Sequence, residues 1–212
     1  MNMAEGIVIQ LQMEALDESV DIETLLRKAY LVARKLQLKE FEEWISFEQN
    51  GYKGDVPDYR TVGGEIKAWN PYHGWIPVVF DGRAADIFNR MPLALPIASI
   101  SDAYNDSDGS VAFTVPGALT ELLNKSDSYL QTNYTFRSSK AELRKIISAV
   151  RNRILDWSIL LEENGIIGDG LKFTEAEVKT AHESQVINNY TNNFYSVTDN
   201  TQIQQGGNGN QQ

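Results

Sequence analysis

The chain has 212 residues, of which 42% are hydrophobic, and a formal net charge of −10. This length allows one domain of roughly 150 to 180 residues with a buried core. The acidic total argues against non-specific binding to nucleic acid or to an anionic membrane, because both surfaces are polyanionic. The chain contains no cysteine, which excludes disulfides and thiolate metal sites.

The N-terminal residues favour a protein of the cytoplasm. Residues 1–19 lack both a basic segment and a continuous apolar stretch, which argues against an ordinary secretory signal. No apolar run in the chain is long enough to span a bilayer. We therefore expect a soluble, cytoplasmic protein that has no contact with a membrane.

The first part of the chain predicts three helices. Residues 7–16 fit helical spacing and strand alternation equally well, and we favour a helix. Asp21 is a suitable N-cap for the next helix, whose apolar stripe continues to Leu36. A third helix begins near Phe41 and ends at Asn50-Gly51, because this pair is typical of a helix end.

The middle of the chain predicts a small mixed β layer. Two strands, residues 61–69 and 75–80, form a hairpin whose loop contains Pro71 and Gly74. Asp81 then begins a short helix that Pro92 stops. The remaining elements predicted here are strands over residues 97–101, 110–115 and 128–137, and a helix over residues 116–124.

The last part of the globular region is predicted to be helical. Ser139 and Glu142 have the spacing of a capping box, which would open a long helix that ends at Asn164-Gly165. A second box, Thr174 to Glu177, opens a helix that continues to about residue 183. Helices followed by strands and then helices indicate an α+β fold. We expect a globular domain over residues 1–183 and a separate tail over residues 184–212.

Several segments of the chain resemble one protein family. They read LLRKAYLVARKL (25–36), KEFEEWISFEQNGY (39–52), VPDYRTVGGEI (56–66) and RNRILDWSILLEENGIIGDGLKFTEAE (151–177). Over roughly residues 5–180, the chain resembles the AbiTii domain family of bacterial abortive-infection proteins. The resemblance implies a role in antiphage defence and brings no established active site with it. We expect no additional effector domain, which would leave either the compact domain or its assembly as the working part.

The tail has a composition of its own. Residues 184–212 contain 13 Asn or Gln residues and one charge, Asp199. From Tyr195 to Gln205 the residue types alternate as in a strand, and a lone strand needs a partner edge. In proteins related to the AbiTii family such a tail can carry a segment similar to Gln202–Gly206. A disordered polar terminus is the other interpretation. If the tail associates with copies of itself, the residues concerned are Tyr195, Val197, Thr201, Ile203 and Gln205.

Three groups of side chains are candidate sites. Trp69, Tyr72 and Trp75 at the hairpin tip form either an exposed recognition patch or part of the core. The segment from Arg137 to Arg153 has six basic residues against one acid, and Arg144 and Arg151 are candidates for partner binding. Such helix-borne charges more often pair with acids or face solvent. Asp102, Asp106 and Asp108 can supply oxygen ligands for a metal ion, although their sequence context is typical of a turn.

These observations favour a binding protein over an enzyme. We expect an antiphage module that self-associates, engages a phage or host component and uses no cofactor. A metal-dependent nuclease toxin that uses the three aspartates is the first alternative. A structural homo-oligomeric scaffold is the second.

Overall fold

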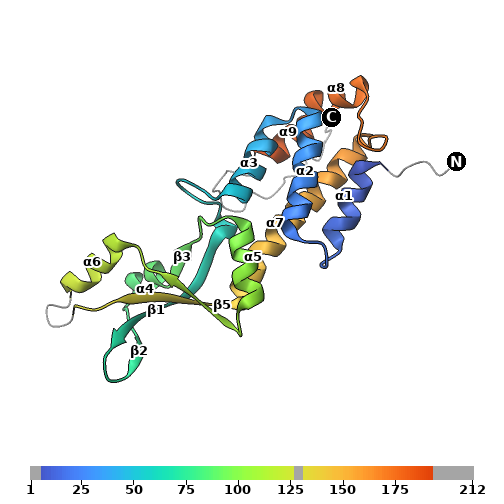
Figure 1. Ribbon diagram of the computed structural model, residues 1–212. Helices are drawn as coiled ribbons and strands as arrows, with labels where there is room; N and C mark the ends of the chain where they lie inside the picture. Colours follow the sequence, from blue (N-terminus) through green and yellow to red (C-terminus); the bar gives the residue numbers. More distant parts are fainter. Residues whose placement is uncertain (1–5, 127–130, 193–212) are drawn as a thin grey trace, which may run out of the picture.

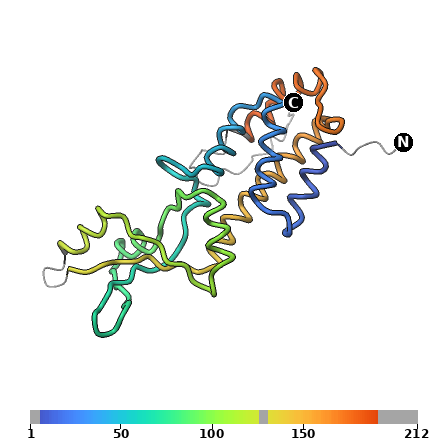
Figure 2. The backbone as a smooth tube through the Cα atoms, viewed as in Figure 1, coloured from blue at the N-terminus to red at the C-terminus, as the bar shows by residue number. Residues whose placement is uncertain are grey.

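The structure is a computed structural model that describes residues 6–126 and 131–192. The described chain forms a helical half and a sheet half, which the long helix α7 (Lys140–Glu163) joins (Figure 1). Figure 2 follows the backbone from the N-terminal helices into the sheet half and back along α7 to the C-terminal helices. This arrangement confirms the predicted α+β fold.

Three helices open the chain, as the sequence predicted: α1 (Ile7–Leu16), α2 (Ile22–Leu36) and α3 (Lys39–Asn50). The amphipathic stripe of α2 is buried along its whole length, from Ile22 to Leu36. Helix α7 packs against α1 and α2 through a second buried stripe. That stripe consists of Leu143, Ile146, Val150, Ile154, Trp157 and Leu161. These two faces form the centre of the core, because burial of apolar side chains is the main favourable contribution to folding.

The sheet has the strand order β2-β1-β5-β4, and each neighbouring pair is antiparallel. Its strands are β1 (Thr61–Asn70), β2 (Gly74–Pro77), β4 (Ser110–Thr114) and β5 (Tyr134–Ser139). A short 3-10 helix, η1 (Asp58–Arg60), precedes β1. The hairpin is therefore confirmed. At Gly64, a Cβ atom would lie 2.4 Å from the backbone oxygen of Arg137, so the close approach of β1 to β5 requires glycine.

Two elements of the sheet half differ from the prediction. The strand predicted over residues 97–101 is wrong: these residues begin helix α5 (Ile97–Asp106). Ile97 and Ile100 lie one helical turn apart and are both buried, and α5 packs against α7, so tertiary packing overrides the strand preference of isoleucine. Strand β3 (Arg90–Pro92), which pairs with the start of β1, was not predicted.

The other helices of the sheet half are α4 (Arg83–Phe88) and α6 (Gly117–Ser126), close to the predicted positions. Helix α4 begins after Gly82 and not after Asp81. Strand β5 begins at Tyr134, later than residue 128. Figure 1 shows α6 and the β1-β2 hairpin at the end of the molecule farthest from α8.

One of the two predicted capping boxes is present. Thr174 accepts a hydrogen bond from the backbone of Glu177, whose carboxylate accepts one in return, and α8 (Glu175–Glu183) follows. The box predicted at the start of α7 is wrong, because the side chain of Ser139 caps no backbone group. The carboxylate of Glu142 instead accepts a hydrogen bond from the backbone N–H of Gly63 at 3.0 Å. That bond ties the start of α7 to β1.

The beginning of the predicted tail is part of the helical half. Helix α9 (Gln185–Asn192) buries Ile187 completely, and the hydroxyl of Tyr190 donates to the backbone oxygen of Arg153 on α7 at 3.2 Å. The alternating segment, residues 195–205, lies outside the described residues. Within the described ranges, no helix has both the length and the apolar character that crossing a membrane requires.

Candidate functional site

The β1-β2 hairpin has a hydrogen-bonded turn with exposed aromatic side chains. The side-chain oxygen of Asn70 accepts hydrogen bonds from the backbone N–H groups of Tyr72 and His73, at 2.9 and 3.1 Å. The rings of Trp69 and Trp75 meet edge to face, with centroids 5.3 Å apart. Tyr72 is 91% exposed and Trp69 43% exposed. Tyr72 and Trp69 are therefore exposed, whereas Trp75 is half-buried.

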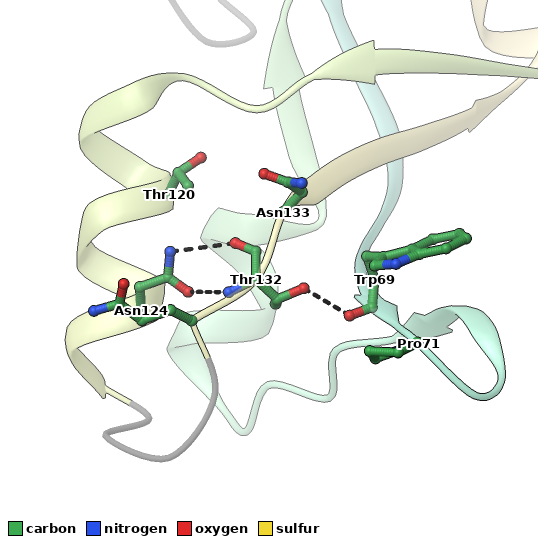
Figure 3. A pocket seen from close by; sticks show the side chains of 7 residues that line it. Trp69, Pro71, Thr120, Asn124, Thr132 and Asn133 are labelled. Carbon is green, nitrogen blue, oxygen red and sulfur yellow. Dashed lines mark hydrogen bonds between the residues drawn. The ribbon is translucent and has the colours of Figure 1, made fainter.

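A polar pocket of about 440 Å³, here called the amide pocket, lies between this hairpin and α6 (Figure 3). Its wall is made by Trp69, Pro71, Thr120, Asn124, Gln131, Thr132 and Asn133. Asn124 accepts from the backbone N–H of Thr132 at 3.0 Å and donates to its carbonyl at 3.2 Å. The hydroxyl of Thr132 donates to the carbonyl of Trp69 at 2.6 Å. The hydrogen bonds of Thr132 to Asn124 and to Trp69 therefore connect α6 to the hairpin. Figure 3 shows that the indole of Trp69 is directed away from α6.

A second, more apolar cavity of about 520 Å³, the apolar groove, lies between α4, α6 and the sheet. Ala68 on β1 pairs with Ile76 on β2 and with Tyr134 on β5, so the three side chains lie on the same face of the sheet. The apolar groove is lined by Ala68, Ile76, Pro77, Val78, Val79, Phe80, Phe88, Leu122, Leu123, Thr132 and Tyr134. None of these side chains carries a charge, so the groove suits an apolar ligand surface.

Exposed aliphatic side chains extend the apolar groove. Val79 is 85% exposed and Ile76 is 36% exposed. Phe88 also lines a neighbouring cavity of about 260 Å³, whose rim includes Ile87, and Ile87 is 66% exposed. Large aliphatic side chains gathered beside a groove are typical of a surface that contacts another molecule.

The basic segment of α7 mostly contacts the chain itself. Arg151 donates to the backbone oxygens of Glu14 and Asp17, both at 3.0 Å, and burial lowers the pKa of its guanidinium. Arg144 pairs with Glu18 at 3.4 Å, and both side chains are largely exposed. Arg151 on α7 thus fixes the C-terminal end of α1 through hydrogen bonds, whereas Arg144 forms an ion pair on the surface.

The other basic residues of this segment are also engaged, except for one. Lys145 pairs with Glu142, and Lys140 lies 4.6 Å from the centre of the Tyr104 ring. The guanidinium of Arg153 lies 3.9 Å from the centre of the Tyr59 ring. Arg137 is the exception: its Nε is buried and has no hydrogen-bond partner among the described residues. The segment therefore does not present a continuous row of cations to a phosphate backbone.

The three aspartates of the alternative metal site lie on an exposed surface. Asp102 and Asp106 belong to α5, and Asp108 belongs to the turn that precedes β4. Nowhere in residues 6–126 and 131–192 do three or more His, Cys, Asp or Glu side chains gather in a way that could hold a metal ion.

A buried polar network between the two halves was missed at the sequence level. The carboxylate of Glu48 and the guanidinium of Arg60 form an ion pair in which neither side chain is exposed. Glu48 also accepts hydrogen bonds from the hydroxyls of Tyr52 and Tyr59, at 2.6 and 2.5 Å. The indole N–H of Trp44 donates to Tyr59 at 3.0 Å. Burial, followed by the charge of Glu48, raises the pKa of both tyrosines.

This network fixes the segment that connects β3 to α5. Arg60 donates to the backbone oxygen of Leu95 at 2.7 Å, and the backbone N–H of Tyr52 donates to Ala94 at 2.8 Å. A signal was present in the sequence: Glu48 occupies an apolar position of α3, four residues after Trp44 and seven after Phe41. A glutamate at such a position needs a buried partner.

Comparison with known proteins gives a family match and one distant relative. The AbiTii family model matches residues 6–186, which confirms the resemblance seen in the sequence. A protein of Sulfurisphaera ohwakuensis named DNA polymerase 1 is 28% identical over 161 residues. This match covers 76% of the present chain but only 16% of that relative, so the chain spans a small part of the relative's length. No solved structure matches the chain.

Proposed function

The chain belongs to the AbiTii family, and we propose that it is an abortive-infection defence module that binds another protein and associates with copies of itself. Family membership suggests the defence role. The binding mode rests on the apolar groove of the sheet half, and self-association rests on the alternating tail.

The apolar groove favours a protein partner that presents aliphatic or aromatic side chains. Val79 and Ile87 flank Phe88 and expose most of their surface to water. Covering one such side chain fully contributes about 1.5 to 3 kcal/mol to association. The Trp69–Trp75 pair lies on the opposite face of the hairpin from Ala68 and Ile76, so it forms a second, separate surface for contact with a partner. Aromatic side chains are frequent among the residues that dominate protein interfaces.

Electrostatics favour a protein over a nucleic acid as the partner. The chain carries a net charge of −10, which repels a phosphate backbone. Arg151 and Arg153 are held by contacts within the chain. A protein with an apolar surface therefore matches this chain better than a polyanionic nucleic acid does.

Self-association is proposed for the tail. In a strand conformation, Tyr195, Val197, Thr201, Ile203 and Gln205 would share one side with Asp199, the single charge of the segment. A strand of this kind has backbone groups that need partners and side chains that stack with identical ones. Assembly through the tail would leave the apolar groove accessible for the phage or host component.

A phage-challenge assay of variants in cells tests the groove. We expect Val79→Glu/Ile87→Glu to abolish protection, because two carboxylates prevent an apolar partner from docking. Leu16→Glu is the matched control, since Leu16 is 69% exposed at the end of α1, in the helical half. Circular dichroism of the purified variants shows whether each remains folded.

The nuclease alternative is tested in the same assay. Asp106→Ala/Asp108→Ala removes two of the three carboxylates that this alternative requires. Full protection by this variant, together with loss of protection by Val79→Glu/Ile87→Glu, supports the binding module. The reverse pattern would overturn it.

A further inference from the structure

The outer edge of β4 is an open strand edge. The backbone N–H of Lys140 donates to the oxygen of Gly109 at 2.9 Å, which extends the register that pairs Ser110 with Ser139. Hydrogen-bonded pairs alternate along antiparallel strands, so Val111 and Phe113 direct their backbone groups toward β5. Ala112 and Thr114 consequently direct their N–H and C=O groups away from β5. Among the described strands, none pairs with that outer side.

A groove of about 570 Å³ lies beside this edge. It is lined by Ala112–Thr114 of β4, by residues 91–96 and by residues 50–53. The wall opposite β4 is largely apolar, and Leu95 on it is 43% exposed. The Glu48–Arg60 network holds this wall in place through Leu95 and Ala94. The groove therefore has a fixed shape beside unpaired backbone donors and acceptors.

At the opposite edge of the sheet, β2 is less suited than β4 to pair with an added strand. The backbone N–H of Val78 donates to Ile66 at 2.9 Å, so Trp75 and Pro77 are the residues of β2 that face outward. Pro77 has no N–H to donate. An added strand would therefore find a missing donor on β2, whereas β4 offers donors and acceptors at both Ala112 and Thr114.

We propose that residues 195–205 of a second copy of this chain add to the β4 edge as a strand and lie in this groove. In a strand, the alternation of the segment would place six residues on one face: Tyr195, Val197, Asp199, Thr201, Ile203 and Gln205. The apolar members of this face would pack against the apolar wall, and Asp199 would face the groove together with them. The serine, threonine, asparagine and glutamine residues of the other face would remain in water. Main-chain hydrogen bonds supply affinity in strand addition, and side-chain pockets supply specificity.

Charge complementarity supports this occupant. Lys53 is the one charged residue among the groove residues, and Asp199 is the one charged residue of the tail from 184 onward. A single opposite pair between two otherwise uncharged surfaces fixes the register of a strand, because other registers leave each charge without a partner.

The position of α9 favours a second copy over the chain's own tail. Helix α9 packs against α7, α8 and α3 in the helical half, whereas β4 belongs to the sheet half (Figure 1). Two residues separate Asn192 from Tyr195, so Tyr195 lies within about 11 Å of Asn192, given the maximum reach of an extended chain. The strand of the same chain would therefore have to start beside the helical half and run from there toward β4, a restriction that does not apply to the tail of a neighbouring copy.

Complementation between two full-length variants tests the inference, which rests on the self-association part of the proposed function. Ile203→Pro disrupts the proposed strand of the tail and leaves the outer edge of β4 unchanged. Ala112→Pro removes an outward N–H of β4 and keeps the tail, and Ala112→Ser is its matched control. We expect wild type and Ala112→Ser to form oligomers in light scattering and each proline variant to be monomeric. An equimolar mixture of the two proline variants should form a heterodimer, because one intact tail and one intact edge remain.

If Ala112→Pro fails to fold, exchanging the charges of Lys53 and Asp199 provides a second test of docking at β4. Lys53→Glu should weaken association about three-fold or more, the effect of an exposed ion pair, and Lys53→Glu/Asp199→Lys should restore it. Oligomers that persist in Ala112→Pro, or a Lys53→Glu defect that Asp199→Lys does not rescue, would overturn docking at this edge. A wild-type protein that is monomeric in light scattering would also overturn docking at this edge. Phage protection is read separately, so protection by a monomeric protein would reject this assembly but leave the defence role in place.

Discussion

The indole of Trp157 on α7 stacks on the ring of Phe41 on α3, with centroids 3.9 Å apart and planes inclined by 21°. Neither side chain is exposed to solvent. The stack therefore joins the long helix to the N-terminal helices at the centre of the core. Aromatic pairs in such geometry contribute more than their buried area alone.

Trp157→Ala should lower the free energy of unfolding by about 3 to 5 kcal/mol, because it leaves a large cavity. Trp157→Phe should cost clearly less, since the indole nitrogen has no hydrogen-bond partner among the described residues. Urea denaturation of both variants measures the difference. Equal losses in the two variants would contradict this interpretation, as would an unchanged midpoint for Trp157→Ala.

Glu48→Ala should destabilise the protein by about 3 to 5 kcal/mol, because it leaves the guanidinium of Arg60 buried without its partner. Tyr52→Phe removes one hydrogen bond to the same carboxylate and should cost about 1.5 to 3 kcal/mol. The control is Glu18→Ala, which breaks the exposed pair with Arg144 and should cost at most about 1 kcal/mol. Thermal unfolding ranks the three variants, and a Glu48→Ala loss no larger than that of Glu18→Ala would refute the buried pair.

Glu142→Gln should reduce stability at neutral pH but not in strong acid. The N–H of Gly63, and then Lys145, hold the pKa of Glu142 below its ordinary value. Its stabilisation is therefore fully present above the unfolded pKa of about 4.3 and is lost as the pH falls through the lower folded value. The expected difference at pH 7 is about 1 kcal/mol.

Denaturation of wild type and Glu142→Gln between pH 7 and pH 2 measures this dependence. Glu163→Gln, the same substitution at an exposed position of the same helix, is the matched control for the loss of a surface carboxylate. If the difference in unfolding free energy between wild type and Glu142→Gln increased as the pH falls, it would contradict this mechanism.

Asn124→Ala should loosen the connection between α6 and β5, because both hydrogen bonds to Thr132 are lost. The expected cost is about 1 to 2 kcal/mol. Hydrogen exchange gives a local readout: the backbone amide of Thr132 should lose protection. Thr120→Ala changes another residue of the amide pocket and should leave that amide protected.

The helices that the sequence predicted correctly are those whose signals are local. The stripe of α2 repeats at helical spacing and Asp21 accepts a hydrogen bond from the N–H of Thr24, so neighbours along the chain determine both the helix and its start. The box of Thr174 and Glu177 is local in the same sense. Such elements depend little on the rest of the fold.

The misassigned elements depend on partners far away in the sequence. Glu142 does not close a capping box because Gly63, 79 positions away, occupies its carboxylate. Glu48 finds Arg60 only after α3 and η1 pack together. The apolar groove combines strands, α4 and α6, so no segment of the sequence contains it. The hairpin tip was identified as a candidate because its aromatic residues are close in sequence.

Helix α7 contacts α1 and α2 in one half and β1 and β5 in the other. Because its backbone is continuous, neither half can melt without removing packing partners from the same helix. The protein should therefore unfold in one cooperative transition. Fluorescence of Trp69 and Trp75 in the sheet half and of Trp44 and Trp157 in the helical half would then change at the same temperature.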